Sequence, residues 1–327
     1  TKQMFTFEGR NGEYCLAPTA EEIVLDFIKE NIVSYKDLPV NIFQIGNKYR
    51  DELRVRGGLL RSKEFLMKDG YSFHASFEDM VKEYNSMKEC YIKIFSDLGL
   101  NVIAVKAVSA EIGGKVSEEF MCFSDIGEDT VLLDNKNGIA LNTEILEYPD
   151  MLQEIKDSIP DFDVKNLQEV QCIELGHIFQ LGKVYSESMG GYYVNSDGKK
   201  EAYYMGCYGI GINRTLGAIC ENNCDEEGLV WPDSIAPYKC VIVPANEYLS
   251  EAENLYHTLK GNCIDTVLDD RNITFGTKIK DAKLLGFPYM VIIGKKYSEN
   301  SQLEVEKRKS YEKFFLDKND LINLLKK

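Results

Sequence analysis

Apolar positions are most regularly spaced in the last third of the chain, where short apolar runs alternate with stretches of helical spacing. The runs predict strands at 240–244, 264–268, 289–293 and 303–308. The helical spacing predicts helices at 249–259, 277–285 and 321–325. Because strands that alternate with helices indicate βαβ units, we expect a small α/β domain with a mixed sheet.

The larger N-terminal part is less regular, but one long helix is predicted from Phe77 to Leu98. Ser76 suits its N-terminus together with Asp79, and Gly99 suits its C-terminus. The spacing predicts one apolar face made of Phe77, Val81, Tyr84, Met87, Tyr91, Ile94, Phe95 and Leu98. A hairpin is predicted with arms at 131–133 and 138–142.

Two prolines in the segment 228–237 predict a domain boundary, with one domain at 1–234 and a second at 235–327. The chain of 327 residues is 44% hydrophobic, which suffices for two cores. Its net charge of −15 is uneven, because residues 235–327 hold 15 Lys and Arg against 13 Asp and Glu. The acidic charge therefore lies in the first part, and this asymmetry indicates that the two parts have different functions.

The composition also bears on the compartment. Nine scattered cysteines fit reduced thiols, and Cys220 and Cys224 lack the second ligand pair that a structural zinc site needs. No apolar run is long enough for a membrane span, and no secretion leader is visible. We expect a cytoplasmic protein, or alternatively one of an organellar matrix, with no membrane partner and no structural metal.

The strongest chemical signal is the segment 48–73, in which two arms flank a loop rich in Arg and Gly. Arg50, Arg54, Arg56 and Arg61 lie close together along the chain. Guanidinium groups match phosphate oxygens, so the hairpin suits a polyphosphate, although a solvated basic turn fits the spacing equally well.

A second signal is the glycine-rich stretch 205–219. Gly209 and Gly211 are followed by Arg214, so the dinucleotide and Walker patterns both fail. A strand that runs into a helix is expected, with glycines that let a ligand approach the backbone. Tight strand–helix packing is the alternative.

Two further segments carry candidate polar groups. Thr19 and Glu22 fit a capping box at the start of a helix that carries Ile23, Phe27 and Ile28, and Glu21 in its first turn can point into a cleft. In the segment 174–182, His177 lies among apolar residues, where a histidine is more often part of the core.

Taken in this order, the segments resemble the bacterial-type prolyl-tRNA synthetases of class II. Residues 18–22 resemble the Thr-x-Glu motif of the proline pocket, 49–73 resemble motif 2, and 206–214 resemble motif 3. Residues 268–271, 280–282, 286–288 and 304–308 resemble the anticodon-binding domain. The resemblance implies an antiparallel catalytic sheet flanked by helices (an α+β domain), followed by a small α/β domain with a mixed five-stranded sheet.

The resemblance also implies an activity, the ATP-dependent attachment of proline to tRNA(Pro), with ATP and Mg²⁺ as the substrate complex. Arg50 and Arg214 would be catalytic. The implied ATP-binding residues are Arg50, Glu52, Arg61, Phe65 and Arg214, with Phe65 and Arg214 around the adenine. The implied proline-binding residues are Thr19, Glu21, Arg50, Glu174, His177, Cys207 and Gly209. Arg271, Lys280 and Arg308 would contact the anticodon.

Three departures from the family pattern are visible. Motif 1, which family members use to form a homodimer, should precede Thr1, so we expect a truncated chain of a homodimeric protein. Only 29 residues separate Glu144 from Glu174, which is too few for the family's editing insertion, so we expect uncorrected mischarging with alanine. Position 118 is Glu, where the family usually has His.

Two alternatives stay open at this point. One is another class II synthetase, such as a threonyl enzyme, which the Thr-x-Glu motif and the segment 176–179 disfavour. The other is a non-catalytic paralogue that binds nucleic acid or a partner protein, which the presence of Arg50, Glu52, Phe65 and Arg214 disfavours.

Overall fold

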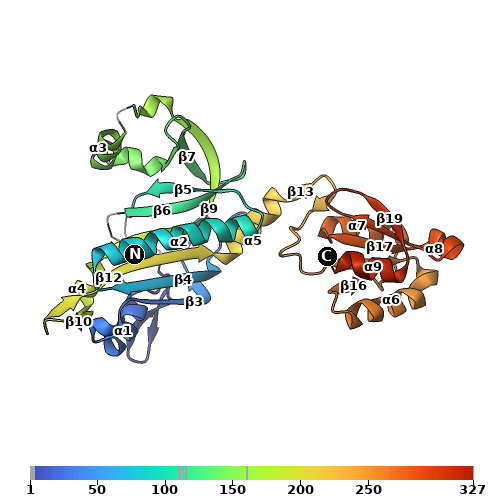
Figure 1. Ribbon diagram of the computed structural model, residues 1–327, viewed down its shortest axis with the longest axis horizontal. Helices are drawn as coiled ribbons and strands as arrows, with labels where there is room; N and C mark the ends of the chain where they lie inside the picture. The colour runs from blue at the N-terminus through green and yellow to red at the C-terminus, as the bar shows by residue number, and fades with distance from the viewer. Residues whose placement is uncertain (1–3, 110–111, 113, 115, 160, 327) are drawn as a thin grey trace. The chain divides into compact units, whose positions relative to one another are not determined.

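The structure is a computed structural model that describes residues 4–109, 112, 114, 116–159 and 161–326. The chain divides into two compact units, Thr1–Ala218 and Ile219–Lys327, and each has its own sheet (Figure 1). No helix in the described ranges combines the length and the apolar character that crossing a membrane requires.

The first unit is built on an eight-stranded sheet in the order β3-β4-β12-β9-β6-β5-β8-β7. Its neighbouring strands pair antiparallel except for β5 and β8. The strands are β3 (Val40–Tyr49), β4 (Glu64–His74), β5 (Val102–Ala107), β6 (Val116–Phe123), β7 (Asp129–Asp134), β8 (Ile139–Asn142), β9 (Gln168–Gly182) and β12 (Tyr204–Gly211). The expected antiparallel sheet and the hairpin of β7 and β8 are confirmed.

Shorter elements surround this sheet. The helices are α1 (Glu21–Asn31), α3 (Pro149–Ser158), α4 (Val184–Met189) and α5 (Ile212–Asn222). Two small hairpins are formed by β1 (Thr6–Gly9) with β2 (Gly12–Cys15) and by β10 (Tyr192–Val194) with β11 (Lys200–Ala202).

The long helix α2 (Phe77–Asp97) lies along the sheet and contacts β4, β9 and β12 (Figure 1). As predicted, the Ser76 hydroxyl accepts a hydrogen bond from the backbone N–H of Asp79 at 3.2 Å. The buried face differs in part from the prediction, because it is formed by Met80, Tyr84, Tyr91 and Phe95. Phe77 and Ile94 are exposed, since they lie on the flanks of the stripe that faces the sheet.

Alternation along β4 separates the two faces of the sheet. Lys68 faces α2, and its Nζ donates to the Tyr91 hydroxyl at 2.9 Å. Asp69 and Tyr71 do not share this face, because successive side chains of a strand point to opposite sides. They line a cavity instead. The helix therefore covers one face of the sheet and leaves the other available for a site.

The second unit contains a five-stranded sheet in the order β16-β15-β17-β18-β19. Its strands are β15 (Cys240–Pro244), β16 (Thr266–Leu268), β17 (Tyr289–Ile293), β18 (Leu303–Lys307) and β19 (Lys313–Leu316). β15, β16 and β17 pair parallel and the rest antiparallel, which confirms the expected mixed sheet. The four predicted strands are present, while β19 was not predicted as a strand.

Helices pack on both faces of this second sheet. They are α6 (Leu249–Gly261), α7 (Phe275–Leu285), α8 (Lys295–Asn300) and α9 (Lys318–Leu325). Ile242 of β15 packs with residues of α6 and α9, whereas Val241 packs with Ala282 of α7. The unit also holds the short hairpin of β13 (Cys224–Asp225) and β14 (Gly228–Leu229), and β14 is the start of the segment predicted as a domain boundary.

Candidate active site

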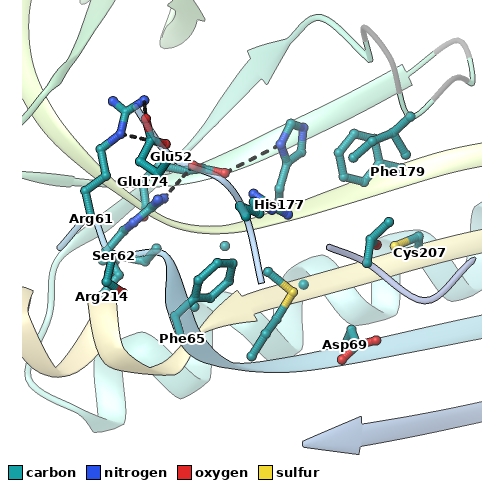
Figure 2. A pocket seen from close by; sticks show the side chains of 18 of the residues that line it. Glu52, Arg61, Ser62, Phe65, Asp69, Glu174, His177, Phe179, Cys207 and Arg214 are labelled. Carbon is teal, nitrogen blue, oxygen red and sulfur yellow. Dashed lines mark hydrogen bonds and ion pairs between the residues drawn. The ribbon is translucent and has the colours of Figure 1, made fainter. Parts of the chain in front are cut away.

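An open cavity lies over one face of β4, β9 and β12 in the first unit (Figure 2). Its lining brings together every catalytic, ATP-binding and proline-binding residue that the resemblance implied. These residues are Thr19, Glu21, Arg50, Glu52, Arg61, Phe65, Glu174, His177, Cys207, Gly209 and Arg214. They come from segments up to nearly two hundred positions apart, so only the fold makes them neighbours.

Arg50 follows β3 at the base of the arginine-rich loop. Its guanidinium lies over the Phe65 ring at 5.3 Å, and its Nε donates to the carbonyl of Pro18 at 3.3 Å. Burial lowers the pKa of Arg50, although the side chain remains a cation at neutral pH. Among the described residues, no carboxylate accepts a hydrogen bond from this partly buried guanidinium, so it is suited to an anionic ligand.

Arg61 and Glu52 face each other across the same loop (Figure 2). Arg61 Nε lies 3.0 Å from Glu52 Oε2, and Arg61 Nη2 donates to Glu52 Oε1 at 3.0 Å. The hydrogen bonds from Arg61 lower the pKa of the Glu52 carboxyl. This bidentate pair fixes both side chains at the rim of the cavity.

Arg214 lies at the start of α5, where β12 runs into the helix as predicted. Its Nη1 donates to Glu174 Oε2 at 2.6 Å and to the Glu174 carbonyl at 3.0 Å, while its Nε donates to the Leu60 carbonyl at 3.0 Å. Arg214 is thereby tied both to β9 and to the arginine-rich loop. Arg50 and Arg214 thus share one cavity, as the enzyme interpretation requires.

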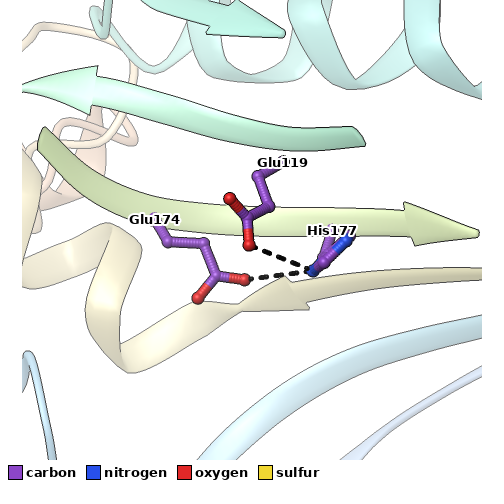
Figure 3. A group of neighbouring side chains, drawn as sticks. All are labelled: Glu119, Glu174 and His177. Carbon is purple, nitrogen blue, oxygen red and sulfur yellow. Dashed lines mark ion pairs between the residues drawn. The ribbon is translucent and has the colours of Figure 1, made fainter. Parts of the chain in front are cut away.

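Glu119, Glu174 and His177 form a compact group on β6 and β9 (Figure 3). His177 Nδ1 lies 3.6 Å from an oxygen of each carboxylate, and His177 Nε2 is buried without a hydrogen-bond partner among the described residues. Burial and the charge of Glu174 raise the pKa of Glu119. Burial alone would raise the pKa of Glu174 too, but His177 and Arg214 lower it.

The sequence analysis missed Glu119. Its neighbour Glu118 occupies the other face of β6, where it accepts from Tyr84 at 2.9 Å and pairs with Lys88 at 2.6 Å. The alternation of a strand therefore sends one of two consecutive glutamates to α2 and the other to the site.

The end of the cavity opposite to Arg61 holds Thr19, Glu21 and Cys207. The predicted capping box is wrong, because α1 begins after Ala20 without a side-chain cap. The Thr19 hydroxyl donates to Glu21 instead, and Cys207 Sγ contacts Glu21 Oε1 at 3.3 Å. Glu21 is only 1% exposed, and burial together with this carboxylate raises the pKa of the Cys207 thiol.

The floor of the cavity contains a buried ion pair that the sequence analysis also missed. Lys48 Nζ lies 2.7 Å from Asp69 Oδ1, and both residues are 2% exposed. Asp69 Oδ2 accepts from Tyr71 and from Gln44, each at 2.8 Å. All charged groups of the pair are satisfied, so the floor is held rigidly.

In the second unit, Arg271 lines another cavity and is half exposed. It is held by Asp269 at 2.7 Å and by Asp281 at 2.9 Å. Lys280 is exposed on α7. Arg308 is different, because it is only 4% exposed and its guanidinium pairs with Asp225 at 2.5 Å. These contacts favour a supporting role for Arg308 over direct contact with a ligand.

Comparison with known sequences gives the class of protein that this fold and cavity define. Residues 5–223 match the family described as "tRNA synthetase class II core domain (G, H, P, S and T)", and residues 239–327 match the "Anticodon binding domain". The first match covers most of the chain and includes all the residues that line the cavity described above.

Curated relatives identify which family of class II synthetases the chain belongs to. The chain is 40% identical to the proline–tRNA ligase of Sulfurimonas denitrificans over 95% of this chain and 75% of that protein. It is 39% identical to a probable mitochondrial proline–tRNA ligase of Schizosaccharomyces pombe over 99% of this chain and 76% of that protein. The chain therefore belongs to the proline–tRNA ligase family of class II synthetases.

A solved structure shows the same fold. Prolyl-tRNA synthetase from Cryptosporidium parvum, complexed with L-proline and AMP, aligns with a TM-score of 0.76 at 20% identity. The alignment covers 100% of this chain and 62% of that one, so the present chain spans less than two thirds of the solved protein.

Proposed function

We propose that this chain activates proline with ATP to form prolyl-adenylate and transfers the prolyl group to tRNA(Pro). The observation that carries the proposal is that Arg50, Arg214 and Glu21 line one cavity. The family membership supports the same conclusion, because the curated relatives carry the name proline–tRNA ligase.

Two arginines at one end of the cavity suit a nucleoside triphosphate. The proline carboxylate attacks the α-phosphorus in line, and pyrophosphate leaves; Arg50 would offset the negative charge that develops between the two reactants. Arg214 and the Phe65 ring would enclose the adenine. Glu52 would accept a hydrogen bond from the adenine amino group. Because the reaction needs no protein nucleophile, positioning and charge account for the catalysis.

The other end suits a small secondary amine. Glu21 is a buried carboxylate whose oxygens contact the neutral donors of Thr19 and Cys207, so a cationic ligand would compensate its charge. The ammonium of proline carries such a charge. His177, Gly209 and Cys207 would shape the space for the ring, and the floor held by Asp69 limits its depth.

Mg²⁺ is expected with ATP, and the carboxylates present fit it. Glu174 offers oxygen ligands beside Arg214, with Glu119 next to it, and oxygen is the ligand atom that Mg²⁺ prefers. When bound, the ion would supply positive charge to the phosphates. The imidazole of His177 is a poorer ligand for Mg²⁺, so it would orient the carboxylates instead.

The remaining assignments follow from the family. Residues 1–234 would form the catalytic domain and 235–327 the anticodon-binding domain, with Arg271 and Lys280 as exposed cations for the tRNA. The full-length protein would be a homodimer in the cytoplasm or an organellar matrix.

Proline-dependent exchange of pyrophosphate into ATP tests the first step, and charging of tRNA(Pro) tests the second. We expect exchange with proline and not with threonine. Exchange that depends on threonine, or on no amino acid, would refute the assignment. ATP binding without any exchange would instead support a non-catalytic paralogue.

A further inference from the structure

Glu128 lies outside the motifs discussed so far, yet it contacts two arginines of the loop between β3 and β4. Arg61 Nη1 donates to Glu128 Oε2 at 2.8 Å, and Arg56 Nε contacts Glu128 Oε1. Since Glu52 holds Arg61 from another side, the Arg61 guanidinium is clamped between two carboxylates. Burial alone would raise the pKa of Glu128, but hydrogen bonds from Arg61 and Arg56 lower it, so Glu128 is ionised at neutral pH.

The backbone that carries Glu128 is fixed to the sheet. The N–H of Ser124 donates to the Gln171 carbonyl at 3.1 Å, and the N–H of Gly127 donates to the Ser124 carbonyl at 2.9 Å. A Cβ at Gly127 would collide with the backbone of Cys172, so only glycine lets this turn press against β9. Glu128 therefore projects from a rigid support, and its side chain is 20% exposed.

The loop that Glu128 holds is intrinsically less constrained. Gly57 and Gly58 both adopt positive φ values, 63° and 58°, at its tip. Arg56 and Arg61 pair through their backbones at 3.2 Å on either side of this turn. Glycine loses more backbone conformational entropy on ordering than any other residue. Without the contacts to Glu128, a ligand that binds this loop would have to order it, at a cost in binding free energy.

Arg61 keeps donors for a ligand while it is clamped. A guanidinium has five N–H groups, and the contacts with Glu52 and Glu128 use one N–H each on Nε, Nη1 and Nη2. The two remaining N–H groups can bind phosphate oxygens without release of either carboxylate.

We propose that Glu128 is a positioning residue for ATP binding, which acts by holding Arg61 of the loop in the orientation that meets the triphosphate. The inference rests on the proposed function, in which Arg61 binds ATP. The opposite role is competition, in which Glu128 binds the Arg61 guanidinium when ATP is absent and the phosphates must displace it. The two roles predict opposite changes in ATP affinity when Glu128 is removed.

The test is the dissociation constant of ATP, measured by calorimetry without proline, for the wild type, Glu128→Ala and Glu128→Gln. We expect Glu128→Ala to weaken ATP binding about tenfold, the loss typical of a charged hydrogen bond. Glu128→Gln keeps one acceptor and should weaken binding less. In the exchange assay, KM for ATP should rise while KM for proline stays unchanged. Unchanged or tighter ATP binding would overturn the proposal.

Asp125→Ala is the matched control, because it removes the same charge from an exposed position of the same turn. An equal loss of affinity in Asp125→Ala would assign the effect to overall charge and refute positioning. In an Arg61→Ala background, Glu128→Ala should cause no further loss, whereas a full additional loss would exclude action through Arg61.

Hydrogen exchange of residues 53–62 without ligand gives a readout that does not need activity. Faster exchange in Glu128→Ala supports the clamp, and unchanged exchange contradicts it. Should the alanine variant fail to fold, the nearly isosteric Glu128→Gln carries the same comparison. A wild type that binds ATP but shows no proline-dependent exchange would refute the proposed function and leave the clamp measurable.

Discussion

Cys207 Sγ lies 3.3 Å from Glu21 Oε1, which joins the middle of β12 to the first turn of α1. The contact connects segments 186 positions apart. It places a nearly inaccessible carboxylate at the end of the cavity opposite to Arg61, where a small cation can be bound.

The first prediction concerns this carboxylate. Glu21→Gln should raise KM for proline at least tenfold in pyrophosphate exchange, because a charged hydrogen bond to the ammonium becomes a neutral one, a loss of about 1.5–3 kcal/mol. KM for ATP should stay within about twofold, since Glu21 lies at the other end. Glu22→Gln, the same change at an exposed neighbour, is the control. Equal effects of both variants would remove Glu21 from the proline site.

The second prediction concerns Arg50. Arg50→Ala should slow proline-dependent exchange by a factor of about 10²–10³, the loss typical of one electrostatic donor at a reacting centre. Arg54→Ala, an exposed arginine of the same loop, should have little effect. Normal exchange by Arg50→Ala, measured at saturating ATP and proline, would exclude its assigned role.

The third prediction concerns pH. The folded state raises the pKa of Glu119, so it retains a proton that the unfolded chain releases above about pH 4.3. Folded stability therefore falls as pH rises from that value through the raised pKa. Glu119→Gln has no such proton. The melting temperature of the variant minus that of the wild type should therefore increase from pH 5 to pH 8.

Calorimetric melting without ligands checks this prediction. Glu118→Gln is the control, because Glu118 is the adjacent residue of β6 and contacts Tyr84 and Lys88 of α2. Its stability difference from the wild type should not follow the same pH trend. Parallel curves for Glu119→Gln and the wild type would show that Glu119 titrates at its ordinary pKa.

The fourth prediction concerns the second unit. Arg271→Ala should raise KM for tRNA(Pro) in charging and leave proline-dependent exchange unchanged, because exchange needs no tRNA. The weakened binding should also depend less on salt, since one phosphate contact is lost. Lys260→Ala on α6 is the control. A collapse of exchange in Arg271→Ala would contradict the assignment.

Local signals in the sequence predicted much of the secondary structure. Cys240–Pro244 and Tyr289–Ile293 are strands with the predicted bounds, because fully buried strands are continuous apolar runs. The start of α2 was predicted from Ser76 and Asp79, whose hydrogen bond is local. The predicted Thr19 capping box is absent because the Thr19 hydroxyl donates to the Glu21 carboxylate instead. Glu21 is buried, so its carboxylate needs hydrogen-bond donors from the protein.

The sequence by itself determined the family, the order of the motifs and the arginine, glutamate and glycine residues that the cavity contains. Only the tertiary structure decided that Glu119 lies beside Glu174 and His177, that Glu128 faces Arg61, that Asp69 is neutralised by Lys48, and that Arg308 is buried. These relationships depend on strand order and register, which place residues side by side that are dozens of positions apart. No local pattern of residues encodes such a distance, because pairing across a sheet is fixed by the burial of the whole unit.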